Sequence, residues 1–142
     1  MKRLTVYFGL VLLQVCMQAG CVSTSNTELG KEEFVSKCAS CHGLSGKGDG
    51  PQSTVTRPAN LTILAKKNGG VFPSRRVHEI IDGRQEVAAH GPRTMPIWGM
   101  FFQVDVPDVP DEATGITNYR ETTVSDRIQA LIDYLKTLQD MN

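Results

Sequence analysis

Cys38-Ala39-Ser40-Cys41-His42 is the stretch of sequence from which the rest of the chain can be interpreted. Its two cysteines lie about one turn of backbone apart, and a histidine directly follows the second. This spacing suits two thioether bonds to the vinyl groups of one haem, with the imidazole of His42 as proximal ligand of the iron. The motif therefore predicts one haem c, covalently attached through Cys38 and Cys41.

Two other uses of a paired cysteine lack their usual sequence context. A structural zinc site needs a second ligand pair of similar spacing, and the remaining cysteines, Cys16 and Cys21, lie in a predicted export segment. A thioredoxin-type dithiol follows a hydrophobic strand in a βαβ pattern. The residues before this motif, 28–37, are instead charged and helical in pattern.

Residues 1–20 have the layout of a secretory signal peptide. Lys2 and Arg3 precede an apolar run over residues 4–15. The run is shorter than the roughly 20 residues that a membrane-spanning helix needs. We therefore expect export to the periplasm.

Ala19-Gly20-Cys21 resembles a bacterial lipobox, in which the cysteine is acylated, although Gln18 stands where leucine is usual. Ordinary cleavage after Ala19 is the alternative. Acylation is favoured because Cys21 would otherwise be a lone thiol in an oxidising compartment. Any attachment of the protein to a membrane is therefore expected to be through an acylated Cys21.

The remaining chain is short enough for a polar leader, residues 21–26, and one domain, residues 27–142. Removal of the signal takes away two basic residues and no acidic one, so the formal charge falls from zero to −2. This balance does not indicate a nucleic-acid partner. The motif occurs once, which predicts one haem.

Helices are predicted at both ends of the domain. Residues 27–40 place Gly30, Phe34 and Cys38 on one helical face. A glycine inside a helix costs about 1 kcal/mol, so we expect another element to pack closely on Gly30. The last helix has a 3.6-residue apolar period, and Thr123 with Asp126 predicts its start. The periodic residues are Ile128, Leu131, Ile132, Leu135 and Leu138.

With these features the chain resembles a class I c-type cytochrome, over roughly residues 27–139. The resemblance implies an all-α fold, with helices wrapped around one covalently bound haem. It also implies that Gly30 and Phe34 meet Leu131 and Tyr134, although ordinary buried pairs would predict the same fold. A backbone carbonyl of the glycine-rich loop, residues 43–51, is expected to accept a hydrogen bond from His42.

The sequence between the two terminal helices predicts a loop and short helices. The glycine-rich loop lacks the Walker spacing of a phosphate-binding loop. A short helix is expected over residues 61–67, ended by Asn68-Gly69-Gly70. Another is expected from about residue 73 to Gly83, and it should bury Val77, Ile80 and Ile81.

A second ligand for the iron is expected in residues 90–102. Met95 is the best candidate, because Pro96 restricts its backbone and Met-Pro after a Gly/Pro turn resembles the distal loop of class I cytochromes. Met100, predicted to pack in the core or at the haem edge, and His90 and His78 remain alternatives. The predicted haem contacts are Trp98, Arg93 and Asn60.

Residues 104–120 form an acidic, proline-containing insertion. Asp105, Asp108 and Asp111 fall at every third position, which would place them on one side of a polyproline II segment. The insertion is either a solvated loop or a stripe on which a basic partner docks.

The function implied is that of a single-electron carrier, not an enzyme, with redox proteins as partners in a periplasmic or membrane-associated chain. A cytochrome subunit of a larger dehydrogenase or oxidase complex would have the same sequence features. A haem sensor or enzyme would need an open distal site, and no acid/base pair is placed for peroxide chemistry.

Overall fold

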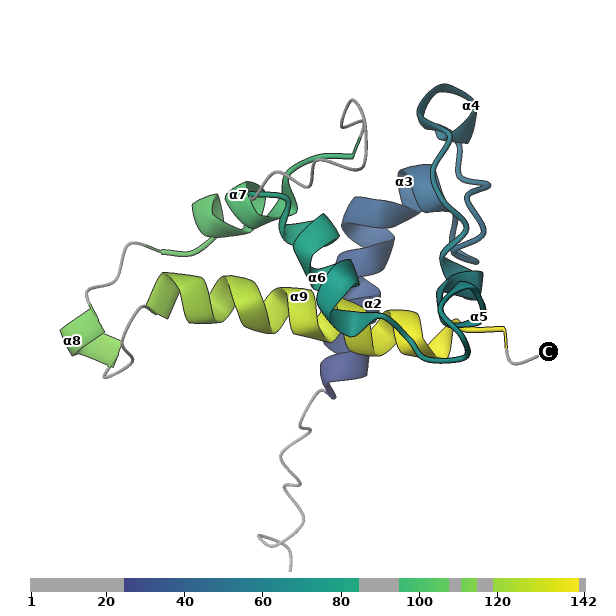
Figure 1. The fold of residues 1–142 in the computed structure, drawn as a ribbon. Helices are drawn as coiled ribbons and strands as arrows, with labels where there is room; N and C mark the ends of the chain where they lie inside the picture. The colour runs from purple at the N-terminus through teal and green to yellow at the C-terminus, as the bar shows by residue number, and fades with distance from the viewer. Residues whose placement is uncertain (1–24, 85–94, 108–110, 115–118, 141–142) are drawn as a thin grey trace, which may run out of the picture.

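The computed structural model describes residues 25–84, 95–107, 111–114 and 119–140. Over these ranges the chain is helical and contains no strand, which confirms the predicted all-α fold. Figure 1 shows the C-terminal helix α9, Tyr119–Thr137, running across the molecule, with α2 crossing it and α6 and α7 packed along it. None of the described helices is long and apolar enough to cross a membrane.

The N-terminal helix runs without interruption from Asn26 to His42, close to its predicted bounds. It consists of α2 (Asn26–Glu33), a π-helical segment η2 (Phe34–Cys38) and α3 (Ala39–His42). The hydroxyl of Ser25 caps it by accepting a hydrogen bond of 3.3 Å from the backbone N–H of Glu28. Wide π turns are rare, and no local pattern in the sequence predicted this one.

The crossing of α2 and α9 brings two backbones into direct contact at Gly30. A Cβ atom on Gly30 would overlap the carbonyl group of Ala130 and lie 3.0 Å from the backbone nitrogen of Leu131. One turn later, the ring of Phe34 packs on that of Tyr134, with centroids 5.3 Å apart. The pairing of Gly30 and Phe34 with Leu131 and Tyr134 is confirmed.

Helix α9 begins at Tyr119, so the start predicted from Thr123 and Asp126 is wrong. Tertiary contacts support the additional turn: the Arg120 guanidinium donates to the backbone carbonyls of Gln103 (2.6 Å) and Val106 (3.2 Å). The predicted apolar period is confirmed, because its residues lie in the core; Leu138, the last of them, is only partly buried. The buried residues of this helix are Val124, Ile128, Ala130, Leu131, Ile132 and Leu135.

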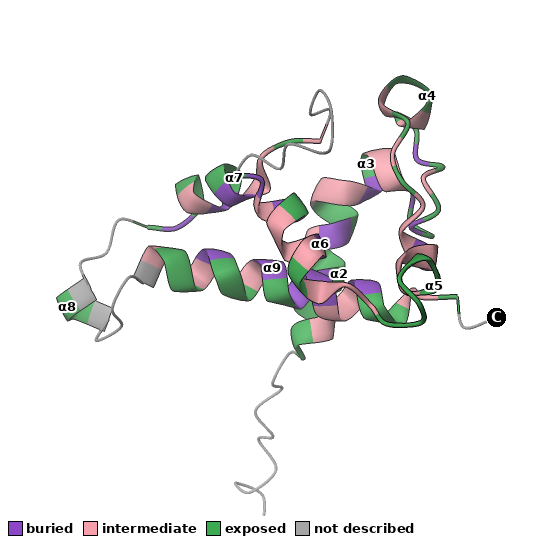
Figure 2. Cartoon of the chain, in the orientation of Figure 1, coloured by how far each residue is buried: buried purple, intermediate pink, exposed green. Residues whose placement is uncertain are grey.

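Short helices connect these two ends. They are α4 (Ser53–Thr56), the 3₁₀ turn η3 (Leu61–Ile63), α5 (Leu64–Lys67) and α6 (Ser74–Asp82), which ends at Gly83 with φ 65°. Helix α6 contains buried, partly buried and exposed residues (Figure 2). Val77 and Ile81 are buried as predicted, but Ile80 is 37% exposed. Ile80 lies at the edge of the stripe that Val77 and Ile81 form four residues apart.

The predicted insertion is partly helical. Val104 is the last residue of α7 (Trp98–Val104), and α8 occupies Asp111–Thr114. Asp105 has helical dihedral angles (φ −74°, ψ −12°) and forms an ion pair of 3.3 Å with Arg127. The polyproline path is therefore wrong at Asp105 and at Asp111, the first residue of α8. Asp108 and the side chain of Asp111 lie outside the described residues.

Gly30→Ala tests the close approach of α2 and α9. We expect the free energy of unfolding to fall by about 3 kcal/mol, because a methyl group must displace the backbone of Ala130. Guanidinium unfolding of the haem-loaded protein measures the change. Lys31→Ala is the control, because this neighbouring side chain is exposed; an equal loss in both variants would contradict the packing argument.

Candidate haem site

The two cysteines and the histidine of the motif lie at the C-terminal end of the N-terminal helix. Cys38 is the last residue of η2, and Cys41 and His42 belong to α3. The backbone N–H of Gly43 closes the helix by donating to the carbonyl of Ala39 at 2.9 Å. No disulfide joins the two cysteines, and Cys38 packs partly buried against the hydrophobic core.

The glycine-rich loop folds back onto this helix end. Backbone N–H groups of the loop and of Gln52, which directly follows it, donate to carbonyls at the end of the helix. They are Gly48 to His42 (2.8 Å), Gly50 to Cys41 (3.1 Å) and Gln52 to Ser40 (2.9 Å). The loop therefore fixes the backbone of the motif.

The imidazole of His42 is oriented by a more distant residue. Its Nδ1 lies 3.0 Å from the backbone carbonyl of Ala59, which corrects the prediction that a carbonyl of residues 43–51 would play this part. That loop is instead held against the backbone of the helix end, and the chain reaches the ring only after Pro58. With Nδ1 donating to Ala59, Nε2 is the nitrogen left for a metal.

Burial shifts the pKa values of two side chains of the motif, His42 and Cys38. It lowers the pKa of His42, and the smaller effect of the Ala59 hydrogen bond acts in the opposite direction. A neutral imidazole is the form that ligates a metal. Burial, followed by the negative charge of Glu33, raises the pKa of Cys38 to about 12. Cys38 is therefore a protonated thiol at neutral pH, unlike the activated cysteine of a redox dithiol.

A set of partly buried apolar side chains packs against the hydrophobic core. Each has one side on the core and keeps some exposed surface. The set contains both Cys38 and Met95, the predicted distal ligand. Its other members are Leu61, Leu64, Phe72, Trp98, Tyr134 and Leu138. Two cysteines at this spacing and an oriented, neutral imidazole fit a covalently bound haem.

The two candidate methionines differ in burial. Met95 packs against the core, whereas Met100 is 55% exposed. Met100 therefore does not pack in the core, and its predicted packing at the haem edge stays a prediction. Trp98 packs on Phe101 and Phe102, with ring centroids 5.5 and 6.0 Å apart. A haem contact of Trp98 stays a prediction.

The remaining predicted contacts and alternative ligands are not tested by the described residues. Asn60 caps η3, since its side-chain oxygen accepts a 2.9 Å hydrogen bond from the N–H of Thr62, and its contact with haem stays a prediction. His90 and Arg93 lie outside the described residues. His78 is a partly buried residue of α6.

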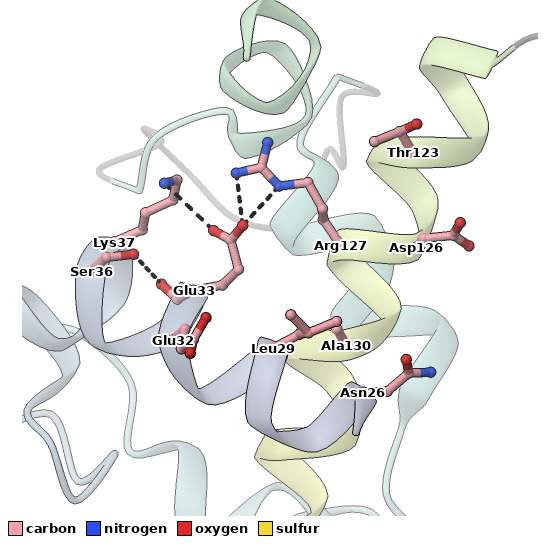
Figure 3. Close-up of a pocket in the computed structure, with 10 residues that line it drawn as sticks. All are labelled: Asn26, Leu29, Glu32, Glu33, Ser36, Lys37, Thr123, Asp126, Arg127 and Ala130. Atoms are coloured by element: carbon pink, nitrogen blue, oxygen red, sulfur yellow. Dashed lines mark hydrogen bonds and ion pairs between the residues drawn. The ribbon is translucent and has the colours of Figure 1, made fainter. Parts of the chain in front are cut away.

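Sequence reasoning missed an ion-pair junction beside the motif. Figure 3 shows Glu33, on α2, between Lys37 and Arg127. Arg127 lies 2.7 Å from one carboxylate oxygen, and Lys37 lies 3.5 Å from the other. The guanidinium of Arg127 also lies 4.2 Å from the ring centre of Phe102. The junction therefore ties α2 to α9 and α7 within two turns of Cys38.

This fold and motif define a small all-α protein with covalently held haem. A comparison with known protein families matches residues 27–139 to the family described as Cytochrome c. The chain belongs to the cytochrome c family, as the class I resemblance predicted, and it binds haem c covalently as an electron-transfer protein. Searches of curated proteins and of solved structures found no match.

Replacing both cysteines tests the attachment. We expect the wild-type protein to keep its colour in acidified acetone and to carry the mass of one haem, because thioether bonds survive this extraction. The Cys38→Ala/Cys41→Ala variant should lose haem to the solvent. Ser40→Ala, an exposed position between the two thiols, is the matched control and should retain haem. Release of haem from the wild type would contradict covalent attachment.

Proposed function

We propose that the protein carries single electrons with a haem held by Cys38 and Cys41, its iron ligated by His42 and Met95. The bound haem supplies an iron centre that takes up and releases one electron. The chain holds two strong ligands in fixed positions, so that little has to rearrange when the charge changes.

The hydrogen bond between His42 and Ala59 is the observation that carries this proposal. At 3.0 Å it fixes the ring and its tautomer, and it makes Nε2 a stronger donor to a metal. The backbone bonds to Cys41 and His42 hold the helix end from which this ring projects. These contacts support a permanent proximal ligand.

Burial favours Met95 as the distal ligand. Met95 packs against the same core as Cys38, while more than half of Met100 is exposed. The following Pro96 restricts the backbone of Met95 to extended conformations. A thioether ligand favours ferrous iron, so Met95 would raise the reduction potential.

The proposed place of action is the periplasm, with redox proteins as donor and acceptor. Residues 1–20 support export, because they have the charge and apolar run of a signal peptide. Acylation of Cys21 would keep the domain at a membrane surface, beside membrane-bound partners.

Met95→Ala tests the distal ligand. The ferric wild type should have a weak charge-transfer band in the far red, which arises from methionine sulfur on iron. The variant should lose this band, have a lower potential and bind carbon monoxide when reduced, because one axial position becomes open. Met100→Leu is the control and should keep the band. If the band survives Met95→Ala and disappears in Met100→Leu, the ligand is Met100.

Cys21→Ala tests the lipid anchor. The acylated wild type should sediment with membranes, since each buried CH₂ of a lipid chain contributes about 0.8 kcal/mol of binding. The variant should appear in the soluble periplasmic fraction or remain unprocessed. A soluble wild type with an N-terminus at Gly20 would instead show ordinary cleavage. Cys16→Ala is the matched control, because Cys16 leaves with the signal.

A further inference from the structure

The position of Met95 is coupled to that of helix α7. Only two residues, one of them Pro96, separate Met95 from Trp98, the first residue of α7. A connection this short spans about 10 Å when fully extended, and the proline removes part of its freedom. A displacement of α7 would therefore carry Met95 with it.

The N-terminal end of α7 lies directly on the C-terminal end of α6. A Cβ atom on Gly99 would lie 2.7 Å from Nε of Arg84 and 2.8 Å from the backbone carbonyl of Asp82, and it would overlap the Asp82 carboxylate. Gly99 is buried, and no larger residue fits there without moving α7. The contact fixes how closely α7 approaches α6.

Arg84 connects this contact to helix α9. Its guanidinium forms two hydrogen bonds with the carboxylate of Asp82, at 2.6 and 3.1 Å, and a third with Glu121, at 2.8 Å. Glu121 lies in the first turn of α9, within the turn that the sequence did not predict. Paired charged hydrogen bonds of this kind are directional as well as strong.

The same turn of α9 also holds the C-terminal end of α7. The carboxylate of Glu121 accepts a hydrogen bond from the side chain of Gln103, and Arg120 donates to the backbone carbonyl of Gln103 at 2.6 Å. Asp82, Arg84, Gln103 and Glu121 thus form one network, which we call the α7 clamp. The clamp joins α7, the helix that follows Met95, to α6 and α9.

We propose that the α7 clamp is a positioning device for Met95, which it keeps on the iron by holding α7 against α6 and α9. This inference rests on the proposed function, in which Met95 is the distal ligand. The clamp residues need not touch the haem, because they act through the position of α7. Loss of the clamp should let Met95 leave the iron more often while the rest of the fold remains.

The clamp stays charged at neutral pH. Hydrogen bonding to Arg84 lowers the pKa of both Asp82 and Glu121. The side chain of Glu121 is 51% exposed, so water and salt weaken its ion pair with Arg84. We therefore expect an effect on local opening, not collapse of the domain.

Imidazole binding to the ferric, haem-loaded protein measures this opening. Imidazole can bind only after Met95 has left, so its limiting rate at saturating concentration reports the opening step. We expect this rate to rise about tenfold in Arg84→Gln and in Glu121→Gln, since a charged hydrogen bond present only in the closed arrangement is lost. The double variant should open no faster than Arg84→Gln, because the two residues act as a unit.

Lys136→Gln is the matched control. It breaks an ion pair of 2.9 Å with Asp133 on the same helix, about 22 Å along α9 from Glu121. This variant should leave the imidazole rate unchanged. Guanidinium unfolding of all variants then separates opening at Met95 from a general loss of stability.

The outcomes separate this inference from the proposed ligation. A wild type without the far-red band would overturn both. A wild type with the band, and imidazole rates within twofold in the clamp variants, would overturn this inference alone and leave the clamp as a brace between helices. If Arg84→Gln does not fold, Glu121→Gln decides, because it only neutralises a half-exposed carboxylate.

Discussion

The rest of the structure depends on the contact between two backbones at Gly30 and Ala130. Because Gly30 has no side chain, α2 can approach α9 closely enough for the carbonyl of Ala130 to occupy the place of a Cβ atom. This approach lets Phe34 become almost completely buried beside Tyr134, and burial of such a side chain contributes about 1.5–3 kcal/mol. The same helix then delivers Cys38 and His42 to the surface of the core.

Backbone groups, more than side chains, determine the geometry of the motif. Two N–H groups of the glycine-rich loop and that of Gln52 bond to the carbonyls of the helix end, and the carbonyl of Ala59 accepts from the imidazole. Such bonds depend on the path of the chain and not on rotamers, so the ring has little freedom to turn away. Burial adds to this by lowering the pKa of His42, which favours the neutral imidazole that ligates a metal.

Patterns that repeat along the chain were predictable, and contacts between distant segments were not. The spacing of Gly30, Phe34 and Cys38 and the period of the last helix correctly predicted these two helices, and the resemblance to class I cytochromes correctly implied their crossing. The partner of His42 was misplaced because Ala59 is distant in sequence and approaches only through tertiary structure. The start of α9 was misplaced for a similar reason: Arg120 and Glu121 are held by α6 and α7, which outweighs a local capping signal.

The two proposed iron ligands are held by physically different interactions. His42 depends on backbone hydrogen bonds and a buried core, whereas the position of Met95 depends, through α7, on charged groups that are partly open to solvent. Salt weakens ion pairs whose members are partly exposed, whereas hydrogen bonds between uncharged groups respond little to it. The proximal side should therefore be the permanent part of such a site, and the distal side the part that responds to solution conditions. This asymmetry follows from the fold itself, because the proximal ligand lies on the helix that forms the core and the distal ligand on a segment attached to its edge.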